Sequence, residues 1–252
     1  MLFRSANTAL QNTTVTLAGD LTITGNTTIR KKTVVNYTPG TADNAAVYIA
    51  SANTQGGTGY ADFLKVSNIA GGTNPNKTFR LNSTGGIEVI NSAYSANLFT
   101  IDDSGRVIKP YQPVFLVIGS GAGIALNTSA ANAWPTVAQS INTNSCFNTS
   151  TYRFTPNVAG YYFIQSCCYM QFSGTAQVLL ALRKNGSDYK YANYSLSPST
   201  GGDTSSLTST MMYLNGTTDY ASVAIYQNSG STKYVYGSVN HSYFSGCLIK
   251  AE

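Results

Sequence analysis

Apolar and polar residues alternate with a period of two near the start of the chain. Val15, Leu17, Leu21, Ile23 and Ile29 are separated by Thr, Gly and Asn, the pattern of strands that expose one face to water and bury the other. The turn pairs Gly-Asp and Gly-Asn interrupt the alternation. Strands this short bury too little apolar surface to be stable alone, so the pattern predicts that copies of the chain pack together here.

The same pattern of short alternating strands and turns continues to about residue 109, with longer glycine-rich turns at 55–59, 70–73 and 84–86. Strands are expected at 45–50, 60–68, 78–82, 86–90 and 97–101. Residues 97–107 form the clearest unit, a strand, an Asp-Asp-Ser-Gly turn and a second strand. Pro110 and Pro113 cannot donate ladder hydrogen bonds, so they mark the expected domain boundary.

Strand patterns recur every ten to fifteen residues in the rest of the chain, and no amphipathic helix longer than two turns is evident. The predicted strands are 114–118, 135–141, 151–155, 160–171, 176–184, 189–195, 207–214, 220–227, 233–239 and 242–249. This number of strands without helices predicts a two-sheet sandwich of the jelly-roll type. The expected fold class is therefore all-β, with a β-rich N-terminal part followed by a jelly-roll domain.

Composition sharpens the picture at one point. Of the 252 residues, 42% are hydrophobic but only 10% are charged, far below the roughly 25% of ordinary soluble domains. Such a chain is expected to turn much of its side-chain surface toward other subunits. The net charge of +5 is scattered, and the short run 30–32 does not make a nucleic-acid-binding patch. No segment predicts a membrane span or a secretory signal, so we expect assembly in a cytoplasm.

Candidate chemistry is sparse, and we expect a protein that is not an enzyme and needs no metal or cofactor. His241 is the only histidine and lies in an alternating strand pattern, which excludes a two-histidine metal site within one chain and argues against a catalytic triad or histidine acid–base chemistry. Asp188, Asp203 and Asp219 could pair across a subunit interface as glycosidases require, which leaves polysaccharide hydrolysis open. Cysteines 146, 167, 168 and 247 are expected to be free thiols.

Two resemblances give these patterns a context. The stretch 1–36 resembles the repeats of bacteriophage tail-fibre shafts, and 97–107 resembles a motif that closes such shafts. The last 110 residues resemble the trimeric head shared by complement C1q and the tumour-necrosis-factor family. Four motifs carry that second resemblance in order: Phe154, Pro156, Gly160, Tyr162 and Phe163; Leu182 before Asn185 and Gly186; Leu214 with a following Gly-Asp stretch that here contains an inserted Thr-Thr; and Phe244, Gly246 and Leu248 at the end.

The resemblances imply a homotrimer in which these signature residues build the fold and the core of the trimer. They also imply three regions: virion attachment and the start of the shaft at 1–36, shaft at 37–109 and head at 110–252. Head domains of this kind act by binding. The best candidates for receptor contact are Tyr189, Lys190, Tyr191, Tyr194, Tyr234 and Tyr236, because tyrosine offers a flat apolar face and a hydroxyl to sugars or proteins.

The resulting expectation is a structural fibre or spike of a bacteriophage virion whose head adheres to the host surface, a glycan or a protein. Its N-terminal segment would join other tail, neck or capsid proteins. It is not expected to bind nucleic acid or to insert into a membrane. Two alternatives stay open at this point: a fibre that decorates the capsid or neck without a receptor role, and a tailspike that cleaves polysaccharide.

Overall fold

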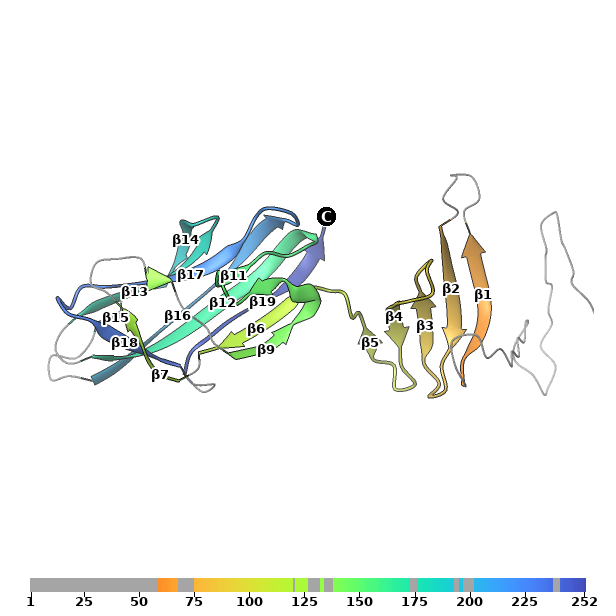
Figure 1. Ribbon diagram of the computed structural model, residues 1–252, viewed down its shortest axis with the longest axis horizontal. Helices are drawn as coiled ribbons and strands as arrows, with labels where there is room; N and C mark the ends of the chain where they lie inside the picture. The colour runs from red at the N-terminus through yellow and green to blue at the C-terminus, as the bar shows by residue number, and fades with distance from the viewer. Residues whose placement is uncertain are drawn as a thin grey trace, which may run out of the picture. The chain divides into compact units, whose positions relative to one another are not determined.

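A computed structural model describes residues 59–67, 75–119, 121–126, 132–133, 138–172, 176–192, 195–196, 202–237 and 241–252. All of them fall within one unit of contacts, Ser51–Glu252. The described residues are almost entirely β-strand (Figure 1), as the sequence predicts. The expected attachment segment 1–36, the predicted strand 45–50 and Tyr194 lie outside the described residues.

The first sheet is a five-stranded antiparallel meander with strands in sequence order (Figure 1). It consists of β1 (Ala61–Ser67), β2 (Asn76–Leu81), β3 (Ile87–Ile90), β4 (Asn97–Ile101) and β5 (Val107–Ile108). The turn between β4 and β5 is closed by Asp102, whose carboxylate accepts the backbone N–H groups of Ser104 and Arg106, and by Gly105 at φ +79°. The Asp-Asp-Ser-Gly hairpin is therefore confirmed.

The remaining strands form a two-sheet sandwich. The sheet that we call the long-strand sheet runs β9 (Ala138–Asn142), β6 (Val114–Ile118), β19 (Tyr243–Ala251), β12 (Ala159–Phe172) and β16 (Gly202–Asn215). At one end, β12 also pairs with β18 (Lys233–Gly237), which in turn pairs with β7 (Gly121–Leu126).

The second sheet, the hairpin sheet, runs β10 (Phe147–Asn148), β11 (Arg153–Phe154), β17 (Ala221–Gln227), β13 (Gln177–Lys184) and β14 (Ser187–Tyr191). The short strands β8 (Asn132–Ala133) and β15 (Ser195–Leu196) pair with β17 and β13. Most neighbours in both sheets are far apart in the sequence, and successive strands pass from one sheet to the other. This strand order is that of a jelly roll, which confirms the predicted fold class.

An aromatic cluster fills the space between the two sheets. The ring of Phe115 stacks on Phe154 with centroids 4.3 Å apart and meets Phe244 edge-on at 4.8 Å. Tyr162 is fully buried, and its hydroxyl donates to the Val158 carbonyl at 2.6 Å. Burial raises the pKa of this phenol well above its usual range. Its hydrogen bond supplies the partner that a buried hydroxyl needs.

Two glycines allow backbones and rings to approach closely. A Cβ placed on Gly160 would lie 2.2 Å from the Lys250 carbonyl oxygen of the neighbouring strand β19. On Gly246 it would lie 2.5 Å from Ile164 and 2.8 Å from Phe115. Close packing thus explains why these two positions of the sequence motifs are glycine, because a Cβ at either would overlap a neighbouring atom.

The Asn185-Gly186 turn joins β13 to β14 as predicted, with φ of +52° and +80° at its two residues, the combination that a two-residue hairpin turn favours. The Asn185 side chain donates to Asp219 at 2.7 Å and accepts the Tyr220 N–H. The structure also explains how the inserted Thr-Thr is accommodated. The Asn215 side-chain oxygen accepts the N–H groups of Thr217, Thr218 and Asp219, so the longer turn is closed by its own first residue.

Asp219 should make the stability of the sandwich depend on acid. Hydrogen bonds from Asn185 and Lys184 lower its folded pKa below 3.8. The carboxylate therefore contributes stability above pH 3.8, and this contribution is lost as the pH falls through the lower folded pKa. We expect the Asp219→Asn variant to have a lower free energy of unfolding than the wild type at pH 7. The difference between the two free energies should be smaller at pH 3. Urea unfolding of both proteins at the two pH values measures this; a gap that does not change with pH would contradict it.

The predicted strands agree closely with the structure, with β6 and β4 matched at both ends. Four short strands were missed, namely β7, β8, β10 and β15, and the predicted strand 151–155 shrinks to the two residues of β11. The four cysteines are free thiols, as predicted. The 3₁₀ turn Thr143–Ser145 is the one helical segment described. Within the described parts of the chain, no helix has the length and apolar character that crossing a membrane requires.

Candidate functional site

The outward face of the long-strand sheet carries apolar side chains at positions that solvent can reach. One ladder row runs across four strands as Val114, Cys247, Phe163 and Met211, and another as Ile118, Tyr243, Cys167 and Leu207. Leu207 keeps 58% of its surface exposed and Met211 44%. A mostly polar row of Leu116, Ser245, Gln165 and Ser209 lies between these two rows. Exposed apolar side chains gathered on one face mark a candidate surface for binding another molecule. We call this surface the apolar head face.

The β1–β5 sheet has an apolar face as well. Its clearest ladder row crosses all five strands as Ala61, Leu81, Ile87, Ile101 and Val107. All but Ala61 of these are exposed large apolar residues, and Val107 is 56% exposed. A second row adds Leu64, Phe79, Val89 and Phe99. We call this surface the apolar meander face.

Polar contacts occupy the opposite face of the meander. Arg80 pairs with Glu88 at 2.6 Å, and its guanidinium lies 4.0 Å above the Tyr60 ring. The Tyr94 hydroxyl donates to Asp62 at 2.8 Å. These groups are satisfied within one chain. The polar groups on one face of the meander are therefore paired within the chain, whereas large apolar side chains on the other face are exposed.

A second group of aromatic side chains gathers at the end of β12 away from Gly160. The rings of Tyr169 and His241 stack at 4.5 Å with an interplanar angle of 18°. Tyr236 meets Tyr169 edge-on at 5.7 Å, and the Tyr169 hydroxyl donates to Asp203. This hydrogen bond raises the pKa of Tyr169. We call these four residues the aromatic end cluster. Tyr234 lies two residues from Tyr236 on the same side of β18 and is exposed.

Among the predicted binding residues, Tyr234 and Tyr236 therefore share a face as expected, but Tyr189 and Tyr191 do not. A β-bulge between Leu182 and Arg183 inserts Tyr189 as an extra residue in β14. The Tyr189 hydroxyl points to the Met211 carbonyl of the other sheet at 3.5 Å, whereas the Tyr191 hydroxyl donates to Asp188. Both rings and Lys190 are exposed, so all three stay candidates for contact, on separate surfaces.

The fold-signature residues lie mainly inside the protomer. Phe154, Tyr162, Leu182, Leu214, Phe244 and Leu248 belong to its buried core, Pro156, Gly160 and Gly246 are buried, and Asn185 and Gly186 form the hairpin turn. Phe163 is the one signature side chain on the apolar head face. The other apolar residues of that face were missed as candidates, although the alternation within 160–171 and 207–214 already separates them from the core positions.

The three aspartates considered for hydrolysis are held in separate contacts of their own chain. Asp188 accepts from Tyr191 and Tyr226 and lies 3.0 Å from Arg183; Asp219 lies 2.9 Å from Lys184; Asp203 accepts from Tyr169. Burial raises the pKa of the thiols of Cys146, Cys167 and Cys168, which disfavours the reactive thiolate. Within the described residues, no three His, Cys, Asp or Glu side chains gather in a way that could hold a metal ion.

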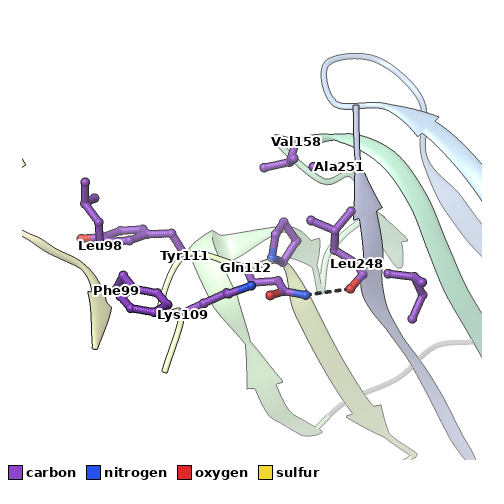
Figure 2. A pocket seen from close by; sticks show the side chains of 10 residues that line it. Leu98, Phe99, Lys109, Tyr111, Gln112, Val158, Leu248 and Ala251 are labelled. Atoms are coloured by element: carbon purple, nitrogen blue, oxygen red, sulfur yellow. Dashed lines mark hydrogen bonds between the residues drawn. The ribbon is translucent and has the colours of Figure 1, made fainter. Parts of the chain in front are cut away.

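A cavity of about 430 Å³ lies beside the connection from β5 to β6. Figure 2 shows the Gln112 side chain donating across it to the Leu248 carbonyl, at 2.8 Å. Lys109 is the only charged residue in a lining made of Leu98, Phe99, Lys109, Tyr111, Gln112, Pro113, Val158, Leu248, Ile249 and Ala251. The cavity thus offers apolar contact and no pair of acid–base groups.

No protein-family model matches the chain, and no curated protein matches it. Similar solved structures include the following two. The globular domain of zebrafish complement 1qA protein is 17% identical and aligns over 56% of this chain and 100% of its own length, with a TM-score of 0.44. Eiger TNF from S. frugiperda is 10% identical over 56% of this chain and 94% of its own, also with a TM-score of 0.44. The jelly-roll assignment itself rests on the strand order described above.

Proposed function

We propose that the chain forms a homotrimeric fibre or spike of a bacteriophage virion, and that its jelly-roll head binds the host cell surface without catalysis. One observation carries the proposal: the chain exposes an apolar face on the β1–β5 sheet and another on the head. Burying an apolar side chain contributes about 1.5–3 kcal/mol relative to leaving it in water. Covering both faces with copies of the same chain turns this exposure into a source of stability.

Three copies suit this arrangement, because closed rotational symmetry can cover the same face on every copy. The apolar meander faces would meet around the axis of the shaft, with the Arg80–Glu88 and Tyr94–Asp62 contacts turned to solvent. The resemblance of residues 1–36 and 97–107 to phage fibre shafts supports the assignment to a virion. The resemblance of the head motifs to trimeric adhesive domains supports a binding role.

Adhesion would be multivalent. Three equivalent heads on one fibre, and several fibres on one virion, raise the overall affinity by about 10²–10⁴ over a single site when the sites can be engaged together. Weak binding by each head would therefore suffice. The mechanism requires a rigid head and a ligand-binding surface; it requires no turnover.

Location on the virion and inhibition of adsorption test the proposal together. Antibody raised to residues 110–252 should label the tail in immunogold electron microscopy, and purified full-length protein should block adsorption of the phage to its host. Label on the capsid or neck without any effect on adsorption would overturn the receptor role in favour of a decorating fibre. Release of reducing ends from host polysaccharide would contradict the absence of catalysis, and no virion label would contradict the viral assignment.

A further inference from the structure

The aromatic end cluster offers a combination of groups that suits one class of ligand. Tyr169, Tyr236 and His241 place three rings within 6.5 Å of one another, and Asp203 lies at their edge through its contact with the Tyr169 hydroxyl. Both His241 and Asp203 are exposed, and the exposed ring of Tyr234 continues the same side of β18.

We propose that the aromatic end cluster is a carbohydrate-binding site, complete within each protomer, for a neutral sugar of the host surface. The inference rests on the proposed function and names the ligand class of its binding step. An aromatic ring packs its apolar face against the C–H side of a pyranose, while its polar edge or hydroxyl hydrogen-bonds the sugar. A carboxylate beside the rings accepts hydrogen bonds from sugar hydroxyls, and such charge-assisted bonds are stronger than neutral ones.

The carboxylate of Asp203 has capacity for such bonds. Within the part of the chain that the structure describes, Tyr169 is its one hydrogen-bond partner, whereas a carboxylate can accept about four hydrogen bonds. Asp188 on the hairpin sheet differs, because Tyr191, Tyr226 and Arg183 all contact it. Tyr111, an exposed tyrosine in the connection from β5 to β6, lies outside the cluster and the predicted binding residues and serves as a matched control.

The side chains on the outward face of the long-strand sheet indicate that the aromatic end cluster is not buried between copies of the chain. Towards Gly160 its outward face carries Phe163 opposite Met211; Cys167 opposite Leu207 is the last apolar pair, and Ser205 lies opposite Tyr169 beyond it. Asp203 is exposed two residues before Ser205. The cores of protein interfaces are depleted of charged residues, and an unpaired carboxylate is costly to bury. The apolar part of the sheet suits a partner copy, and the aromatic end suits a ligand from solution.

The charge of the cluster decides the kind of sugar. Asp203 is its only acidic member and it contains no Lys or Arg, so an anionic sugar would meet a negative charge without a compensating cation. Two like charges that come this close repel each other even in bulk water. The site should accordingly prefer neutral glycans over sialylated or uronic-acid-containing ones.

An array of bacterial surface glycans tests the site with the full-length wild-type protein and three variants. We expect the wild type to bind at least one neutral glycan, and Tyr236→Ala and Asp203→Asn each to weaken that binding about tenfold. Tyr111→Ala should stay within about twofold. Circular dichroism spectra that match the wild type would show that the variants are folded. Binding that both cluster variants leave unchanged, binding only to acidic glycans, or binding to no glycan at all would overturn the inference.

A parallel adsorption experiment separates this inference from the proposed function. If phage adsorbs to periodate-treated cells but not to protease-treated cells, and the wild-type protein blocks this adsorption, then the receptor is a protein. That result leaves the adhesive role intact and overturns the sugar site. Adsorption that periodate abolishes and protease leaves intact, together with loss of blocking in Tyr236→Ala, would support both the sugar site and the adhesive role. Protein that binds a neutral glycan through the cluster but blocks no adsorption would support the site and count against the adhesive role.

Discussion

Gly160→Val is expected to abolish the folded head. The new Cβ would lie 2.2 Å from the Lys250 carbonyl oxygen and 2.9 Å from the Leu248 side chain. A backbone oxygen cannot be moved by a change of rotamer, so β12 and β19 would have to separate where Gly160 pairs with Ala251, at the ends of both strands. We expect a loss of about 3–5 kcal/mol, the upper range for single substitutions, and therefore little soluble protein. Soluble yield and thermal unfolding by circular dichroism measure the effect.

Gly230→Ala provides the matched control for this substitution. Gly230 also lies in the jelly roll and has a φ of +79°, but a Cβ there meets nothing within 4 Å. Only the backbone conformation then opposes the change, at a cost of about 1 kcal/mol. A Gly160→Val protein that unfolds as cooperatively as Gly230→Ala would show that β12 and β19 do not pair as described.

The second large effect is expected from charges on the apolar head face. In the double variant Leu207→Asp with Met211→Lys, both substitutions fall on exposed positions of β16, so the fold of each protomer should survive. In a trimer that covers this face, every copy would bury groups that cost several kcal/mol each unless they are paired. We therefore expect the protein to become a folded monomer. Sedimentation velocity measures the mass, and Lys190→Asp on the hairpin sheet is the control that should leave the trimer intact.

A double variant that remains trimeric would show that copies associate through another surface. The proposed role of the apolar head face would then be wrong, while the jelly-roll fold would stand. A variant that aggregates or loses its circular dichroism spectrum would contradict the description of Leu207 and Met211 as surface positions.

Local patterns predicted the strands well, because alternation and turn residues act over short distances. The Asn185-Gly186 turn and the hairpin at 97–107 follow directly from residues that favour φ above zero or accept backbone N–H groups. The strands that were missed are short, and β7 consists largely of glycine and alanine, so it carries no alternation. Its pairing with β18 depends on contacts more than a hundred residues apart in sequence.

The candidate sites were harder to predict, for two physical reasons. A single bulge in β14 places the side chains of Tyr189 and Tyr191 on different surfaces. The residue types around Tyr189 do not predict that bulge. The aromatic end cluster draws Tyr169, Asp203, Tyr236 and His241 from across 73 residues, and only the pairing of β12 with β16 and β18 brings them together. The sequence indicated Tyr236 but could not indicate its neighbours.

The oligomeric mass of the full-length protein in solution tests the central claim most directly. Light scattering coupled to size-exclusion chromatography, repeated over a hundredfold range of concentration, should give three times the 26.7 kDa of the chain throughout. A monomer at all concentrations would leave both apolar faces open to water, and it would contradict the homotrimeric fibre and the multivalent adhesion that depends on it.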